Sequence, residues 1–398
     1  MNDAAHTAPE PLPATARYVD DEMAATSRSF DWLKAVSPLG TETLWEEFRA
    51  GGCRTAPRFR YPEPGIDTAA TRERLLALPI REIEHPVFKA LLAEKQHELD
   101  RHLELMELRG TSGFMQVSID LFGVAAPDLH AEALHILEVV VPDGANRRDR
   151  VDTRQIVAAA EAQFRHYRNL CPDFSAEVEI SDDITAGLMV SKGKLLITED
   201  LRLPRDRLDA LLHHEVGTHI LTFHNGGHQP LRQLQFGLAH YDELQEGLGV
   251  LAEYLAGNLS PRRLRTLAAR VVAVRLLTDG ASFPDVFDAL RSQHGFGGRS
   301  AFVITARAFR GGGLTKDVVY LRGLRDLIEY LREGHDFGHL FIGKFSLSEL
   351  PALRKLRQEG HLVAPRLLPS YLHDASAQQR LADCGEIPLD HLYQRLVA

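Results

Sequence analysis

Apolar residues recur every three or four positions over long stretches of the chain, the spacing that gathers them on one face of a helix. In the first half of the sequence this pattern predicts helices over residues 16–36, 85–110, 128–140 and 152–170. Asp128 and Asp152 open the last two segments and are candidate N-terminal caps.

The segment GFMQVSIDLFG (113–123) fits either a strand or a helix. Phe114, Ser118 and Phe122 lie four positions apart, as do Met115 and Ile119. This spacing favours a helix.

The pattern then changes to a period of two. SAEVEISDD (175–183) alternates in this way, which predicts a strand, and AGLMVSKGKLLITED (186–200) predicts a hairpin with its turn at Lys192 and Gly193. A helix is expected directly afterwards over 203–223, with Pro204 in its first turn.

Leu208, Leu211 and Leu212 form an inward stripe on that helix, so we expect it to pack on the sheet. Further helices are expected at 241–257, after the cap Ser260-Pro261, and on to about residue 359. The predicted fold class is therefore α+β and mostly helical, with a small mixed or antiparallel sheet packed on the helix of residues 203–223.

Composition narrows the function classes. The 398 residues are 44% hydrophobic and carry a formal net charge of −9, which argues against nucleic acid as a partner. No apolar run is long enough to cross a bilayer and the N-terminus lacks the apolar core of a signal peptide, so we expect a cytoplasmic protein with no membrane partner. The three cysteines are far apart, which predicts free thiols.

The chain is expected to divide into three parts. Residues 1–15 are rich in Ala and Pro and are predicted to be a disordered lead. A helical region over 16–110 and a larger domain over 111–398, which contains the candidate chemistry, are expected to follow.

The candidate chemistry begins at HHEVGTH (213–219), which has one residue more than the zinc-hydrolase pattern His-Glu-x-x-His. A regular helix turns about 100° per residue, so His214 and His219, five positions apart, point in directions about 140° apart. A shared metal therefore requires a π-bulge, or unwinding at Gly217. The alternative is a chance string of surface or capping histidines.

A catalytic zinc site needs a third protein ligand. The predicted helix YDELQEGLGVLAEYL offers Glu243, Glu246 and Glu253. Glu246 is the best placed of the three, because Gly247 and Gly249 beside it let this helix approach the histidines closely.

Four segments in this order, HHEVGTHILTFHNG, QEGLGVLAEYLAGN, GGLTKDVVYLRGL and FGHLFIGKFSL, resemble the flavohemoglobin expression-modulating QEGLA-motif family, whose animal relatives are the microtubule-associated tyrosine carboxypeptidases. The resemblance implies a zincin-like metallopeptidase that binds one Zn²⁺ per chain through His214, His219 and Glu246, with Glu215 as the catalytic base. The chain reads QEGLG where the family has QEGLA, a departure at Gly249 that we expect to affect only local helix packing.

The segment RAFRGGGLTKDVVYLRG supplies candidates for substrate binding. Arg307, Arg310 and Lys316 could hold a substrate carboxylate, and Tyr320 could donate a hydrogen bond to the developing oxyanion. The alternative is a solvated helix face for the two arginines and a helix cap for Lys316. The strand at 187–190 could present an edge to which an extended peptide adds itself.

These features predict a zinc-dependent carboxypeptidase that removes the last residue of a peptide or protein tail with a zinc-activated water. An amidase or aminopeptidase acting on a small substrate, or a non-enzymatic metal-binding regulator, are the alternatives. Asp242 and Glu243 keep the aminopeptidase alternative open, since a free substrate amine requires carboxylates. Tubulin is not expected as the substrate, because this chain is itself acidic.

Overall fold

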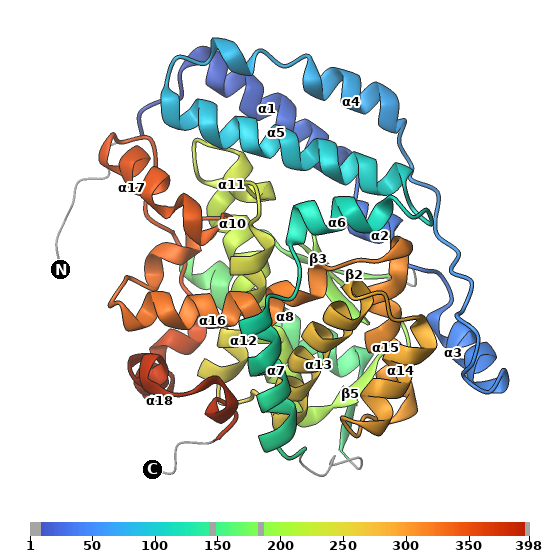
Figure 1. Ribbon diagram of the computed structural model, residues 1–398. Helices are drawn as coiled ribbons and strands as arrows, with labels where there is room; N and C mark the ends of the chain where they lie inside the picture. Colours follow the sequence, from blue (N-terminus) through green and yellow to red (C-terminus); the bar gives the residue numbers. More distant parts are fainter. Residues whose placement is uncertain (1–8, 143–148, 182–186, 395–398) are drawn as a thin grey trace.

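The computed structural model describes residues 9–142, 149–181 and 187–394. Its N-terminal helices α1, α4 and α5 form a layer at one end of the molecule (Figure 1). The predicted lead falls largely on residues 1–8, outside the described part, and helix α1 begins at Ala14. The helix expected over 16–36 is broken at Phe30, and Asp31 then caps the short α2 by accepting a hydrogen bond from the Lys34 amide (2.9 Å). The helices of this region are α1 (Ala14–Ser29), α2 (Trp32–Ala35), α3 (Thr41–Ala50), α4 (Thr68–Leu76) and α5 (Pro86–Glu107).

Three further helices precede the sheets. Residues 113–123 contain α6 (Phe114–Phe122), which confirms a helix there. Helix α7 (Pro127–Val139) starts with Pro127 at its first position, so the prediction of Asp128 as its cap is wrong. Helix α8 (Thr153–Leu170) is capped by Asp152 as predicted, within a capping box completed by Gln155.

The strands form two small sheets. In the first, β2 (Glu177–Ile180) runs parallel to β4 (Lys194–Ile197), and β3 (Leu188–Ser191) runs antiparallel to β4 on its other side. The predicted hairpin is confirmed, with Lys192 and Gly193 both at positive φ (49° and 78°) between β3 and β4. Strand β3 is therefore an edge of this sheet.

The second sheet pairs β1 (Arg150–Asp152) with β5 (Arg202–Pro204). Pro204 lies in β5, where its backbone is extended and it pairs with Arg150 of β1. The prediction that Pro204 lies in the first turn of a helix is therefore wrong. After a 3₁₀ turn, one continuous helical run follows from Leu208 to Gly227. The α+β, mostly helical class is confirmed.

Helix α12 (Asp242–Leu255) lies at the centre of the second half, where it crosses α16 (Val319–Arg332). A Cβ at Gly247 would lie 2.5 Å from the backbone of Gly323, so this crossing brings two backbones into contact. The other helices of this half are α11 (Gln233–Phe236), α13 (Pro261–Thr278), α14 (Phe283–Ser292), α15 (Gly298–Phe309), α17 (Leu350–Gln358) and α18 (Ala375–Asp383). Ser260 caps α13 as predicted, by accepting a hydrogen bond from the Arg263 amide.

Cys53, Cys171 and Cys384 are free thiols, as predicted. None of the described helices is both long and apolar enough to cross a membrane.

Candidate metal centre and active-site cleft

The helical run that carries the two histidines changes its winding between them. Helix α9 (Leu208–His214) passes into a π-helix over Glu215–Ile220, and α10 (Leu221–Gly227) continues from it. The wider turn brings positions i and i+5 onto one side, and the imidazole rings of His214 and His219 lie with their centroids 5.1 Å apart. The prediction of a π-bulge in this segment is confirmed.

Glu246 of α12 meets these two rings. Its Oε2 lies 3.4 Å from Nε2 of His214 and 3.9 Å from Nε2 of His219. One donor atom from each of the three side chains lies within 4.8 Å of the other two. Two imidazoles and one carboxylate are a donor set that suits zinc and leaves a coordination position open.

The outer nitrogen of each imidazole is held by an oxygen acceptor. Nδ1 of His214 lies 3.0 Å from Oε1 of Glu253, and Nδ1 of His219 lies 3.2 Å from Oε1 of Gln245. A proton on Nδ1 satisfies both contacts and directs the Nε2 atom of each ring towards Glu246. The sequence offered Glu253 as an alternative ligand, but the structure brings it behind His214, on the side away from Glu246.

The charges at this centre follow from burial and neighbouring groups. Burial lowers the pKa of His219 to about 3, which keeps it neutral. Burial also opposes the charged form of His214, but its hydrogen bonds to Glu246 and Glu253 raise its pKa to about 9. Although burial opposes ionisation of Glu246, Lys316 and the histidines hold its pKa well below the usual range, so it is a carboxylate.

Glu215, the predicted base, lies beside the centre without being part of the ligand set. Its Oε2 accepts a hydrogen bond from the backbone amide of Val190 in β3 (3.1 Å), which fixes the carboxylate against the edge strand. Burial raises the pKa of Glu215 to about 7. A carboxylate with a pKa near neutrality suits proton transfer at physiological pH.

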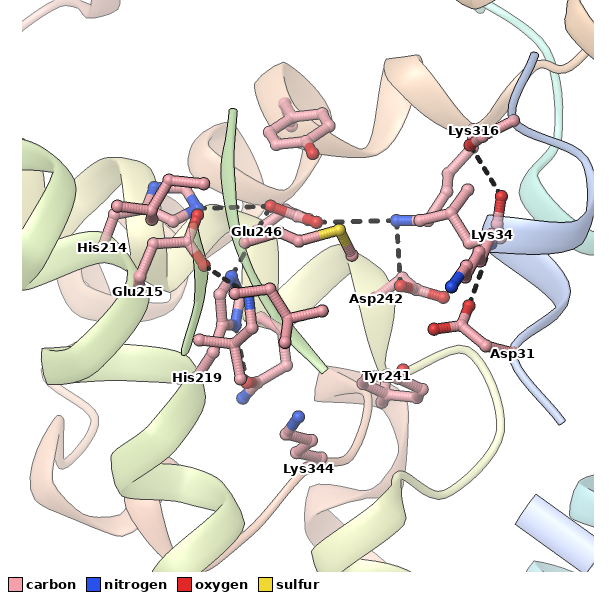
Figure 2. Close-up of a pocket in the computed structure, with 18 of the residues that line it drawn as sticks. Asp31, Lys34, His214, Glu215, His219, Tyr241, Asp242, Glu246, Lys316 and Lys344 are labelled. Carbon is pink, nitrogen blue, oxygen red and sulfur yellow. Dashed lines mark hydrogen bonds and ion pairs between the residues drawn. The ribbon is translucent and has the colours of Figure 1, made fainter. Parts of the chain in front are cut away.

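On its other side Glu246 faces Lys316 (Figure 2). The Lys316 ammonium lies 3.5 Å from Oε1 of Glu246 and 2.9 Å from Oδ1 of Asp242. In the structure Lys316 thus supports Glu246. Glu243, the remaining acidic candidate on α12, is ion-paired with Arg322.

These groups line a cleft of about 210 Å³, which also contains residues that the sequence did not single out. Asp31, the N-cap of α2, and Lys34 of that helix line its Lys316 side, although they lie far from Lys316 in the sequence (Figure 2). Lys344 lies in another wall, 5.8 Å from the ring centroids of Phe223 and Tyr241, and burial lowers its pKa to about 8. Lys344 belongs to FGHLFIGKFSL, one of the four segments that carry the family resemblance, but no periodic pattern in this irregular segment indicated a role for it.

The predicted substrate residues Arg307, Arg310 and Tyr320 line both this cleft and an adjoining compartment of about 260 Å³. Both arginines are at the end of α15 and face inward, so the alternative of a solvated helix face is wrong for Arg310, which is only 5% exposed. Among the described residues, five arginines line the adjoining space, which we call the arginine compartment: Arg207, Arg263, Arg270, Arg307 and Arg310.

Two other groups of side chains in the described part of the chain come close enough to share an ion. They are Cys171 with Asp173 and His224, and His85 with Glu359 and His361. Neither group lines the cleft.

Comparison with known proteins relates the chain to the carboxypeptidases and, within them, to one family. Residues 46–386 match the family model described as microtubule-associated tyrosine carboxypeptidase, and the chain belongs to this family, which confirms the relation indicated by its motifs. No curated protein matches the chain. Among solved structures, a protein from Colwellia psychrerythraea described as a lipoprotein is similar over 86% of this chain and 69% of its own, with 14% identity and a TM-score of 0.43.

Proposed function

We propose that the protein is a zinc-dependent carboxypeptidase with a zincin-like site, which hydrolyses the last peptide bond of a peptide or protein tail. The observation that carries this proposal is the convergence of His214, His219 and Glu246 next to an unligated glutamate, Glu215. A purely structural metal would have no use for that glutamate.

The donor set fits zinc, because both imidazoles are oriented through their outer nitrogens and Glu246 is ionised. When bound there, zinc supplies a Lewis acid that polarises the substrate carbonyl and makes water more acidic. His214, His219 and Glu246 are the residues that would hold it.

The chain's own groups then carry the protons. Glu215 accepts a proton from the attacking water, whose oxygen bonds to the carbonyl carbon, and passes it to the leaving nitrogen as the C–N bond breaks. The products are a new carboxylate and a free amino acid. The Tyr320 hydroxyl forms no hydrogen bond with a described residue and lines the cleft, so it is free to donate to the developing oxyanion.

The direction of substrate binding follows from charge. Strand β3 runs along the cleft from Leu188, which also lines the arginine compartment, towards Ser191 and Lys192, which line a separate hollow. A peptide whose terminal carboxylate lies at the arginines would pair antiparallel with this edge, the more stable arrangement of two strands.

The aminopeptidase alternative has less support. A free substrate amine would need an unpaired carboxylate, but Asp242 is already ion-paired with Lys316, and Glu243 with Arg322. These two acids of α12 therefore have cationic partners, whereas the arginine compartment contains more guanidinium groups than carboxylates.

A test combines metal content with product masses. The purified protein should contain one zinc per chain and shorten members of a peptide library by one C-terminal residue. His219→Ala and Glu246→Ala should lose most of the metal and the activity, whereas His228→Ala, which changes a histidine bonded to the exposed Asp173, should keep both. Full zinc content in both ligand variants, or internal cleavage by the wild type, would contradict the proposal.

A further inference from the structure

The arginine compartment opens directly from the predicted metal centre. It shares His214, Glu215 and Tyr320 with the cleft, so a substrate residue beyond the bond that is cut would enter it. Apolar side chains such as Leu188, Leu211 and Val303 line part of it, and most of its charged groups are guanidinium groups.

Two carboxylates neutralise part of this charge. Glu253 accepts hydrogen bonds from Arg207 (2.8 Å) and Arg263 (3.1 Å). Asp317 accepts two from Arg307, both at 2.6 Å, and lies 3.5 Å from Nε of Arg270. Within the described residues, five arginines thus face two carboxylates that are ion-paired with them, and Glu215 at the metal centre is a third carboxylate in the lining, which leaves a surplus of at least two positive charges.

Of the five arginines, Arg310 has the fewest partners that could neutralise its positive charge. It forms no ion pair with a described residue, and its one hydrogen bond there is from Nη1 to the hydroxyl of Ser37 (3.2 Å). Its Nε has no hydrogen-bond partner, and neither has Nε of Arg270. Burial and the neighbouring guanidinium of Arg307 lower the pKa of Arg310 to about 10, so it remains charged at neutral pH.

A buried cation without a partner is costly to keep, so a compartment with this composition indicates a ligand that brings negative charge. The terminal carboxylate of a peptide brings one negative charge, so at least one positive charge of the surplus stays uncompensated. A second carboxylate on the same residue would bind the remaining guanidinium donors by charge-assisted hydrogen bonds.

We propose that the residue released by this enzyme is acidic, glutamate or aspartate, and that its side-chain and terminal carboxylates are both bound in the arginine compartment through Arg270 and Arg310. This inference rests on the proposed carboxypeptidase function and adds the substrate class. It differs from the tyrosine that the family's description names.

The test uses the zinc-loaded, full-length protein and one peptide sequence that ends in Glu, Gln, Tyr or Leu. The ratio of kcat/KM for Glu over Gln should be at least about tenfold, because Gln has the same shape without the charge. Tyr and Leu should also be poorer than Glu. In Arg270→Met the Glu-to-Gln ratio should collapse towards one, whatever the absolute rate.

A second measurement needs no variant. Free glutamate should inhibit the wild type more strongly than free glutamine or tyrosine, since the released residue binds the same compartment. If peptides are shortened but Tyr or Leu is preferred, or Glu is no better than Gln, the proposal of an acidic residue is wrong while the carboxypeptidase function stands. If no free-acid peptide is shortened, both proposals are wrong.

Discussion

The Nδ1 atom of His214 lies 3.0 Å from Oε1 of Glu253, a carboxylate with no exposed surface. Glu253 lies two helical turns beyond Glu246 on α12, so one helix face offers a carboxylate to each nitrogen of the same imidazole. Although burial opposes it, Arg263 and Arg207 hold the pKa of Glu253 well below the usual range, so this acceptor is ionised. Arg207 and Arg263 of the arginine compartment therefore help to orient His214, because they hold Glu253 in its ionised form.

This relationship predicts that Glu253→Gln weakens zinc binding. The amide oxygen still accepts from His214, but the negative charge that makes the imidazole a better ligand is lost. Zinc affinity should fall by about 10- to 100-fold, the usual effect of removing such a partner. Competition with a chromophoric chelator measures it.

Glu243→Gln is the matched control, because Glu243 lies on the same helix and pairs with Arg322 away from the histidines. It should leave zinc affinity unchanged. Equal losses in the two variants would mean that the effect comes from helix α12 as a whole and that Glu253 has no specific role.

Glu215→Gln should keep zinc but lose turnover. The substitution preserves size and the acceptor for the Val190 amide, and removes the group that takes the proton. We expect kcat to fall by about 10²- to 10⁴-fold. Zinc content measured on the same sample separates the loss of the base from the loss of metal, and a kcat within a few-fold of wild type would show that another group is the base.

Gly249→Ala should disturb the metal centre, although sequence analysis expected this position to affect only helix packing. A Cβ at Gly249 would lie 2.5 Å from Cε1 of His214, so either the imidazole or helix α12 has to move. Zinc affinity should fall by about tenfold or more. Gly217→Ala is the control, since a Cβ there meets nothing closer than 3.7 Å and the π-helix should persist. If Gly249→Ala binds zinc as tightly as wild type, the close approach of α12 does not fix the ring.

The sequence predicted those features that a local pattern encodes. The spacing of His214 and His219 required a distorted helix, and the structure has a π-helix there. Alternation and the Lys192-Gly193 pair predicted the β3–β4 hairpin. Gly249 does allow a close approach to the histidines, whereas Gly247 contacts α16, which the helix pattern alone could not distinguish.

The features that sequence analysis missed depend on long-range packing. Asp31 and Lys34 reach the cleft from a short N-terminal helix, and Lys344 reaches it from an irregular segment. Arg263 and Arg270 look like ordinary polar positions of helix α13 until the fold brings them beside Arg307. Neither the periodicity nor the spacing of residues indicates which distant segments pack together.

The central claim, that this centre removes a C-terminal residue, is tested most directly with three versions of one peptide. One version has a free C-terminus, one a C-terminal amide, and one a free C-terminus with an acetylated N-terminus, and mass spectrometry follows the products. Amidation should suppress cleavage strongly, because the guanidinium groups lose an anionic partner, while acetylation should have little effect. Cleavage that acetylation blocks and amidation does not would contradict the claim and indicate an aminopeptidase.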